Sequence, residues 1–368
     1  MGKKLLKNTE WIILIVSIVL TIIGLIALYS ATQSTENGEF IKQVRWLIIS
    51  IPFLILAFLI DYNILVRFST LAYIVLLILL IGVLFTHPIY GAKSWFSFGN
   101  TFSIQPSEIG KVITICFLAF IMNKMQLKGK KEINKFWKLL IFLIFAAIPV
   151  CLIIIEPDYG TAIGYIMAIL FMIYVSGIDK KYIIVTTVLV IIAVPTIYSK
   201  LPEHALNRIK VFLDPDLDPR GTGYNLIQSK LAIGSGEIFG MGLFKGNQTQ
   251  LGFLHPKTTD FIFSVIGEEM GFVVTGSITI LYIVLITRAI YVAKTAKDNV
   301  GAYIAIGISG MFFFHMAENI GMTIGLLPIT GVPLPFVSYG GSSLITNFIC
   351  IGLLLNISSR RQKSIYVE

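Results

Sequence analysis

The sequence is dominated by apolar runs of about 20 residues, which recur along the whole 368-residue chain. A helix needs about 20 consecutive apolar residues to cross the hydrocarbon core of a bilayer. Only 13% of the residues are charged, whereas soluble domains carry roughly 25%. We therefore expect an all-α polytopic membrane protein with ten transmembrane helices. These lie at about 11–31, 44–60, 64–86, 106–122, 138–156, 158–176, 181–199, 261–288, 300–325 and 338–358.

Lysine and arginine are unevenly divided between alternate connections of these helices. With the N-terminus inside, the inner connections and chain ends hold 18 of them, whereas the short outer connections hold only Lys42, Arg45 and Lys93. Such residues concentrate in the cytoplasmic loops of membrane proteins. The pattern predicts that both termini are cytoplasmic. It also accounts for the net charge of +9 without nucleic acid as a partner.

One long polar passage, residues 200–260, interrupts the apolar pattern between the seventh and eighth helices. The charge pattern places this loop outside the cell, and the chain 1–368 is then a single membrane domain with one large extracellular loop. The loop is too apolar to be typical of disorder, and residues 224–233 favour an amphipathic helix on the membrane surface. An ordered loop of this size is usually functional.

Asp260 stands where this loop returns to the membrane, between Thr259 and Phe261. An ionisable residue at the edge of a bilayer is costly and is functional by default. Burial would raise its pKa toward that of a general base. The position also suits a helix N-cap, and the two roles are compatible. Glu268 and Glu269 follow about two helical turns deeper, so at least one of them should face a cavity or a partner.

The glycine-rich run 234–242, which includes Gly236, adjoins several basic residues in the extracellular loop. Glycines expose backbone N–H groups that can bind an anion. The pattern suits a phosphate or pyrophosphate, and it equally suits contact with anionic lipid headgroups. It is not a Walker loop, because no Gly-Lys-Ser/Thr closes it. The basic residues are Arg208, Lys210, Arg220, Lys230 and Lys245.

Glu108 and Lys111 lie three residues apart in the fourth helix, which Pro106 suits as a first-turn residue. This spacing favours an ion pair within the helix. A pair that only stabilises the helix is one interpretation. The other is that Lys111 pairs with Asp260, since a lysine within a membrane seeks a carboxylate.

Two further places break the apolar pattern. His315, Glu318 and Asn319 interrupt the ninth segment, and a Pro- and Gly-rich stretch covers 325–343. A lone histidine in a membrane helix more often forms interhelical hydrogen bonds than binds a metal. Irregular backbone at membrane depth persists only where it is buried in protein or lines a cavity.

Taken in order, several of these stretches resemble the SEDS proteins, the RodA/FtsW/SpoVE family, over nearly the whole chain. Two departures are Tyr159, where the family commonly has Leu, and 255–257, where Pro-Glu is commoner. The sequence of residues 319–325 is closer to the RodA branch than to FtsW. The resemblance is carried by Trp95 with 105–111 (Gln-Pro-Ser-Glu-x-x-Lys), 156–161 (Glu-Pro-Asp-Tyr-Gly-Thr), 207–209 (Asn-Arg-Ile), 259–263 (Thr-Asp-Phe-Ile-Phe), 267–269 (Gly-Glu-Glu) and 319–343.

The resemblance implies a peptidoglycan glycosyltransferase in the cytoplasmic membrane of a bacterium. Such an enzyme polymerises lipid II into β-1,4 glycan strands on the outer face, in cell elongation and shape control. A class B penicillin-binding protein would be the partner, beside membrane lipids. Asp260 matches the family's essential aspartate, and Lys111 matches a lysine near it.

We expect Asp260, Lys111 and Glu108 to be catalytic, with Asp260 as base or as ligand to a divalent cation (Mg or Mn). The alternatives are a lipid II flippase, a division- or sporulation-specific polymerase, and a scaffold for a partner enzyme. The residues expected to contact the substrate are Arg208, Lys210, Gly236, Lys245, Thr259, Asp158 and Ser338.

Overall fold

The structure is a computed structural model. It describes residues 8–33, 38–88, 92–98, 102–182, 202–219 and 221–361, together with 184, 185, 188, 192, 198 and 199.

Helices coincide with nine of the ten predicted membrane segments within the described residues, and most of the predicted segment 181–199 lies outside them. Seven of the described helices are long and apolar enough to cross a membrane, namely α2, α3, α4, α6, α12, α13 and α14. The elements are α2 Trp11–Ala31, α3 Gly38–Leu59, α4 Tyr62–Val83, β1 Phe96–Phe98, β2 Phe102–Ile104, α5 Pro106–Met125, η2 Lys130–Asn134, α6 Phe136–Ile155, α7 Tyr159–Val175, α9 Glu203–Leu213, η3 Pro215–Leu217, α10 Thr222–Ser235, α11 Asn247–Gln250, α12 Ile262–Lys294, α13 Asn299–Thr323 and α14 Gly341–Ser359.

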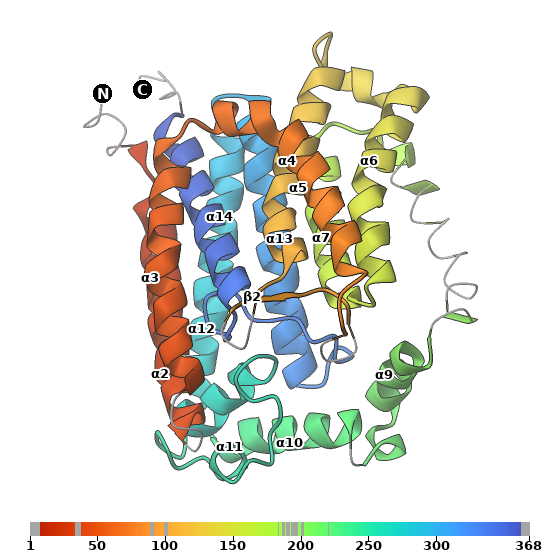
Figure 1. Ribbon diagram of the computed structural model, residues 1–368. Coiled ribbons are helices and arrows are strands. Elements are labelled where there is room, and N and C mark those ends of the chain that lie inside the picture. The colour runs from red at the N-terminus through yellow and green to blue at the C-terminus, as the bar shows by residue number, and fades with distance from the viewer. Residues whose placement is uncertain are drawn as a thin grey trace.

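The long helices run side by side in one bundle (Figure 1). α13 and α14 are mostly buried inside it, whereas α3 and α4 expose many large apolar side chains, as lipid-facing helices do. α2 begins and α14 ends at the same end of the bundle. There Arg361 pairs with Glu10 at 2.8 Å, and the Glu10 N–H donates to Ser358 Oγ at 3.2 Å.

A small antiparallel hairpin, β1 with β2, precedes α5 and was not predicted from the sequence. It pairs Phe96 with Ile104 and lies partway along the bundle, at the start of α5. The backbone N–H of Gln105, which follows β2, donates to Ser342 Oγ on α14 at 3.2 Å. The hairpin therefore connects α4 to a start of α5 that is fixed against α14.

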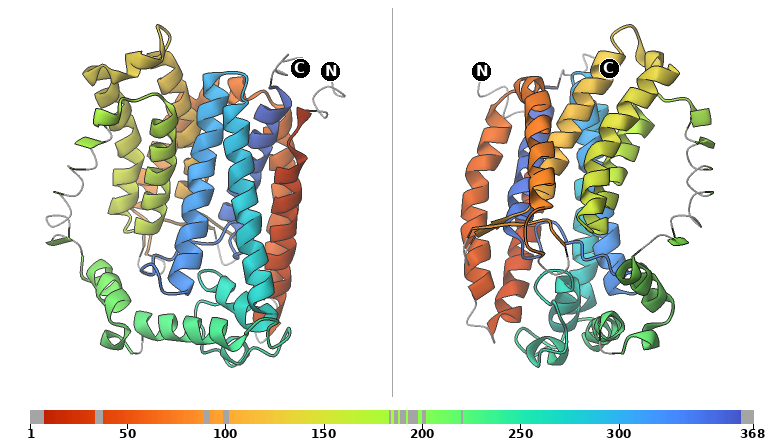
Figure 2. Two further views of the ribbon diagram at one scale, coloured as in Figure 1. Left: turned by 180° about the vertical axis from the view of Figure 1, so that it is seen from behind. Right: turned by 45° about the vertical axis from the view of Figure 1, so that its right-hand side comes forward.

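The predicted extracellular loop is ordered, as expected, where the structure describes it. α10 lies across the end of the bundle, roughly perpendicular to the long helices, and α9 lies obliquely at the side (Figure 2). α10 confirms the helix expected at 224–233. It is anchored by Ser229, whose hydroxyl is 2.7 Å from Ser264 Oγ on α12 and donates to the Thr323 carbonyl on α13 at 2.7 Å.

α12 is bent at Gly271, whose φ of 76° and ψ of −175° are not helical. The bend frees backbone N–H groups that the loop satisfies, because Phe272 and Val273 donate to the carbonyls of Glu237 and Ile238 at 3.0 and 3.1 Å. The glycine-rich run 234–242 thus packs against the bend. This contact fixes the predicted extracellular loop relative to the first part of α12, which begins two residues after Asp260.

Candidate active site

The irregular stretch between α13 and α14, residues 324–340, forms the centre of the candidate site, and we call it the α13–α14 loop. Three side chains of α13 bind it. Asn319 donates to the Val332 carbonyl at 2.8 Å, and His315 Nδ1 lies 3.1 Å from the Pro333 carbonyl. The third is Glu318, whose Oε1 accepts a hydrogen bond from the Thr330 hydroxyl at 2.7 Å. The expected burial of this backbone holds for Val332 and residues 334–338, whereas Ile324, Leu326 and Gly331 are exposed.

Asp260 lies against this loop, two residues before the start of α12. Its backbone carbonyl accepts a hydrogen bond from Asn319 Nδ2 at 3.0 Å. A Cβ added to Gly331, which has a φ of 79°, would lie 3.3 Å from Asp260 Oδ2. The carboxyl group is half-buried. The N-cap of α12 is Phe261, with no side-chain capping bond, so the expected capping role of Asp260 is wrong.

The local electrostatics of Asp260 favour a proton acceptor at neutral pH. Burial raises the pKa of its carboxyl group above the ordinary value. The hydrogen bond with Thr259 and the positive charges of Arg208 and His255 act in the opposite direction. A base is most effective when its pKa lies near the working pH, and a raised carboxyl pKa moves Asp260 toward that condition.

Arg208 of α9 reaches the same place from the predicted extracellular loop. Its Nη1 donates to the Thr330 carbonyl at 3.1 Å, one residue before Gly331. The guanidinium group and the Asp260 carboxyl thus lie on neighbouring residues of the α13–α14 loop. An arginine held in this way is suited to a phosphate oxygen, because its planar donors match phosphate geometry.

Two further predicted residues, Thr259 and Ser338, are brought together. The Ser338 hydroxyl donates to the Thr259 carbonyl at 2.6 Å and accepts from the Leu334 N–H at 2.8 Å. The N–H of Tyr339 donates to the Thr258 carbonyl at 2.9 Å. These bonds join the segment before Asp260 to the α13–α14 loop, so both residues position the acid through backbone contacts.

Lys111 and Glu108 form the predicted ion pair on α5, with 2.7 Å between Nζ and Oε1. Lys111 Nζ also lies 3.0 Å from His315 Nε2. Among the described residues Lys111 forms no ion pair with Asp260, so the expected pairing of these two is wrong. Lys111 reaches the α13–α14 loop through His315, which contacts Pro333, whereas Asp260 contacts Gly331.

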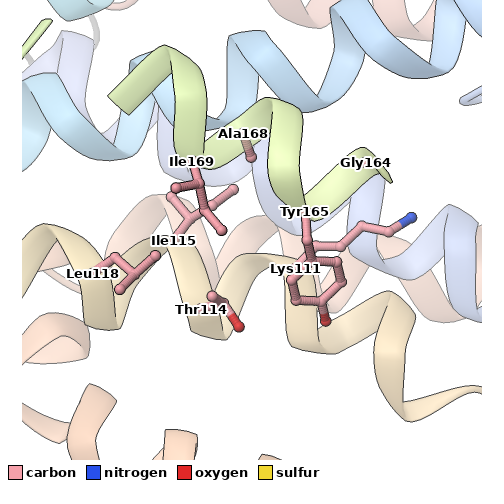
Figure 3. A pocket seen from close by; sticks show the side chains of 8 residues that line it. All are labelled: Lys111, Thr114, Ile115, Leu118, Gly164, Tyr165, Ala168 and Ile169. Carbon is pink, nitrogen blue, oxygen red and sulfur yellow. The ribbon is translucent and has the colours of Figure 1, made fainter. Parts of the chain in front are cut away.

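A cavity of about 10 Å³ lies between α5 and α7 beside Lys111, which is the space of roughly one water molecule. Figure 3 shows the stem of Lys111 next to the ring of Tyr165, with Nζ pointing away from the apolar end formed by Ile115 and Leu118. Thr114 also lines it, and its buried hydroxyl has no hydrogen-bond partner among the described residues.

Asp158 caps the N-terminus of α7, accepting from the Thr161 N–H at 3.2 Å. Its other oxygen accepts from Gln105 Nε2 at 2.7 Å. The next turn packs closely on the α13–α14 loop, since a Cβ at Gly160 would lie 2.5 Å from a Val332 methyl group. Asp158 therefore has a clear structural role next to the site.

Glu268 and Glu269, the two acids expected to face a cavity or a partner, support the predicted extracellular loop. Glu268 accepts from the N–H groups of Gln248 and Thr249 at 2.7 and 2.9 Å, and from the Thr249 hydroxyl at 2.6 Å. It thereby satisfies the N-terminus of α11. Glu269 accepts from Gln250 Nε2 at 2.8 Å. Both acids have the protein partner that the sequence required.

Gly236 contacts α12, and this contact differs from the anion site expected for it. A Cβ at Gly236 would lie 1.8 Å from the Gly267 carbonyl oxygen. The N–H groups of Gly240, Met241 and Gly242 donate to backbone carbonyls within the protein. They are not free to bind an anion, so the run is explained by packing.

Lys245 and Lys210 are exposed on the predicted extracellular loop. Lys210 lines an open hollow of about 360 Å³ on α9 with Glu203, Leu206 and Asn207. Arg208 leaves the same helix toward the α13–α14 loop. Of the basic residues predicted to bind substrate, Arg208 is therefore the one that the structure places beside Asp260.

The described residues contain no group of three or more His, Cys, Asp and Glu side chains that could hold a metal ion. Magnesium is commonly bound by one or two carboxylates together with substrate phosphates. Asp260 fits one ligand of such an ion, but the side chains around it do not complete a metal site. We therefore derive no catalytic step through a metal.

The sequence analysis did not identify Thr330 and Tyr165. The hydroxyl of Tyr165 donates to the Ser107 carbonyl at 2.7 Å, which links α7 to the start of α5. Threonine and tyrosine are common in membrane helices and loops, so neither residue stood out in the sequence as a candidate for function. The polar residues of α13 did carry one, because they interrupt an apolar helix.

The chain as a whole matches one family of known proteins. The family model described as cell cycle protein, FtsW/RodA/SpoVE, matches residues 10–363. This chain belongs to the FtsW/RodA/SpoVE family. Its membership confirms the resemblance seen in the sequence.

Similar members of the FtsW/RodA/SpoVE family carry enzyme names. "Peptidoglycan glycosyltransferase MrdB" of Escherichia coli K12 is 38% identical over 292 residues, covering 79% of this chain and 77% of the relative. "Probable peptidoglycan glycosyltransferase FtsW" of Trichlorobacter lovleyi is 32% identical over 366 residues, covering 96% and 94%.

The chain also shares its fold with a solved structure. A chain from a study of "polymerization and crosslinking by a peptidoglycan synthase complex" aligns with a TM-score of 0.82 at 24% identity. The alignment covers 96% of this chain and 99% of that chain. At this identity the likeness establishes a shared fold.

Proposed function

We propose that this chain is a peptidoglycan glycosyltransferase that polymerises lipid II into β-1,4 glycan strands. The two relatives quoted above are both named as such enzymes, which supports a polymerase over a lipid II flippase. The observation that carries the proposal is the position of Asp260. Asp260 is a half-buried acid with a raised pKa. It and Arg208 contact neighbouring residues of the α13–α14 loop, which α13 holds in place.

In this mechanism Asp260 removes the proton from the acceptor hydroxyl group of one sugar. That hydroxyl oxygen forms a bond to the anomeric carbon of the other sugar, and the bond from this carbon to the pyrophosphate breaks. Arg208 stabilises the negative charge that develops on the departing pyrophosphate. A single displacement converts an α-linked donor into a β-linked product, so one base suffices and no covalent enzyme intermediate forms.

Lys111 has an indirect part in this proposal. Its contact with His315 places a positive charge behind the Pro333 end of the α13–α14 loop. Glu108 neutralises that charge and holds Nζ in place. Lys210 and Lys245 are exposed, and they would attract the pyrophosphate headgroup to the extracellular side.

The membrane arrangement follows the same proposal. The chain has ten transmembrane helices with both ends in the cytoplasm of a bacterium, and Asp260 faces the outside. The excess of Lys and Arg in the inner connections supports this orientation. The RodA branch, with a role in elongation and cell shape, is supported by the residues 319–325.

A class B penicillin-binding protein, which crosslinks the strands, is the proposed partner. The solved chain with the same fold comes from a complex that coordinates polymerization and crosslinking. Such a partner would contact the large apolar side chains that the outer helices expose, together with membrane lipids.

The test is glycan synthesis from lipid II by the purified protein, with and without Mg²⁺ or Mn²⁺. Asp260→Asn and Asp260→Ala should abolish polymerisation while the protein remains folded. Retained polymerisation by Asp260→Ala would contradict the assignment. Lipid scrambling in vesicles, lost in the variant and without polymerisation in the wild type, would favour the transporter. Normal function of Asp260→Asn in cells would favour a scaffold.

A further inference from the structure

Three polar side chains of α13 lie on one face of the helix and bind nearly consecutive residues of the α13–α14 loop. His315, Glu318 and Asn319 are spaced i, i+3 and i+4, which places them on the same face. Their partners are Pro333, Thr330 and Val332 respectively. One face of α13 therefore holds the stretch 330–333. Glu318 binds its first residue, Thr330, and His315 contacts its last residue, Pro333.

Glu318 is the acidic residue of this face, and its burial has to be compensated. Glu318 is only 6% exposed and is the one acid of α13. A buried carboxyl group is costly unless it is hydrogen-bonded. Among the described residues Glu318 forms no ion pair, and its hydrogen-bond partner is the Thr330 hydroxyl at 2.7 Å.

Thr330 connects this acid to Arg208. Its side chain donates to Glu318, while its backbone carbonyl accepts from Arg208 Nη1 at 3.1 Å. Gly331 follows directly and lies against the Asp260 carboxyl group. A rotation of the Thr330 residue would therefore move the acceptor of Arg208 and the neighbour of Asp260 together.

We propose that Glu318 is a positioning residue, which fixes Thr330 and thereby sets the position of Arg208 relative to Asp260. The inference rests on the proposed function, because it assigns Arg208 and Asp260 to the two ends of the same sugar transfer. Glu318 does not itself touch the reacting atoms. It acts through the Thr330 residue.

The effect belongs to the turnover step. Arg208 meets developing charge on the leaving group, so its misplacement raises the barrier more than it weakens ground-state binding. A misplacement of about 1 Å can cost about 100-fold in rate. We expect the kcat for lipid II polymerisation to fall about 10- to 100-fold in Glu318→Leu, with KM changed by less than about threefold.

The experiment compares two disruptive variants with two conservative ones in purified, detergent-solubilised full-length protein. Glu318→Leu removes the acceptor and Thr330→Val removes the donor. Glu318→Gln keeps an acceptor oxygen and Thr330→Ser keeps the hydroxyl, so both should recover most of the lost kcat. If Glu318→Leu does not fold, Thr330→Val carries the same test, since it differs by one atom in a loop residue.

A double-mutant cycle separates positioning from general damage. In Glu318→Leu with Thr330→Val both partners are gone, so the second substitution should add little to the loss of the first. Ser309→Ala on α13 is the matched control, because among the described residues its buried hydroxyl bonds only within the helix, to the Ala305 carbonyl at 2.8 Å. It should leave kcat and KM unchanged.

The outcomes are distinct. The inference is overturned if Glu318→Leu keeps wild-type kcat, if Glu318→Gln is as defective as Glu318→Leu, or if the two single losses multiply in the double variant. Failure of the wild-type protein to polymerise lipid II in a preparation that binds it would overturn the proposed function instead. Non-multiplying losses with rescue by Gln and Ser support the inference.

Discussion

Asn319 on α13 holds Asp260 by its backbone, with 3.0 Å between Asn319 Nδ2 and the Asp260 carbonyl oxygen. The same nitrogen donates to the Val332 carbonyl at 2.8 Å. One buried amide thus joins the segment before α12 to the α13–α14 loop. The carboxyl group of Asp260 is left free for other contacts, because Asn319 uses only its main chain.

Replacing Asn319 should therefore damage both stability and activity. Asn319→Leu leaves two backbone carbonyl groups without a donor, at a cost of roughly 1–3 kcal/mol each in unfolding free energy. The rate of polymerisation should fall together with Tm, because Asp260 loses its fixed position. The control is Asn347→Leu on α14, whose side chain makes, within the part of the chain that the structure describes, only a 3.3 Å bond to Ser343 Oγ, one turn away. Equal effects of the two substitutions would contradict this role.

Asp260→Asn should abolish activity yet raise stability at neutral pH. A raised carboxyl pKa means that the folded state holds the proton more tightly than the unfolded state does. The unfolding free energy of the wild type therefore falls as pH rises from about 4 through the folded pKa. The Asn side chain does not titrate. Tm measured across this range should show the variant gaining on the wild type, and a constant difference would disprove the raised pKa.

The activity of the wild type should follow the same titration in the opposite sense. A general base works only after it loses its proton, so kcat should rise with pH through the pKa of Asp260 in the substrate complex. The inflection should lie above the ordinary carboxyl value of about 4. Initial rates of lipid II polymerisation at constant ionic strength check this, and an inflection at or below the ordinary value would contradict the burial argument.

Most of the fold could be predicted from the sequence. Apolar runs of about 20 residues have few structural solutions in a bilayer, so seven segments were placed within three residues of their observed bounds. The other two missed one end by six residues, because α3 begins at Gly38 and α12 ends at Lys294. Asp260 and the Glu108–Lys111 pair were found because charges are rare in such a chain. Partners across helices could not be found in this way. The contact between Lys111 and His315 joins residues 204 positions apart, and it depends on how α5 packs on α13.

The glycine-rich run shows why local patterns misled. Glycines at 234–242 fit an anion site and close backbone packing equally well from sequence, and only the bend of α12 at Gly271 distinguishes the two. The expected N-cap failed for a similar reason. Helix starts shift by one or two residues easily, and α12 begins at Ile262.

A pair of alanine substitutions tests the packing role of that run. Gly236→Ala places a Cβ 1.8 Å from the Gly267 carbonyl oxygen, whereas a Cβ at Gly234 has nothing within 4 Å. Gly236→Ala should lower Tm clearly, because backbone on α12 must move. Gly234→Ala should change the unfolding free energy by less than about 0.5 kcal/mol, and Tm should therefore hardly change. If both lose substrate binding without a change in Tm, the run binds the anion after all.

Lys111 offers the sharpest separation of stability from chemistry. Breaking a buried ion pair by removing one partner costs about 3–5 kcal/mol, whereas replacing both with apolar residues is often nearly neutral. Lys111→Met should thus be strongly destabilising, and Lys111→Met with Glu108→Leu should recover most of the lost Tm. Activity should not recover in the double variant, because the contact from Lys111 to His315 and onward to Pro333 is still missing. Recovery of polymerisation together with Tm would reduce the pair to a structural element of α5.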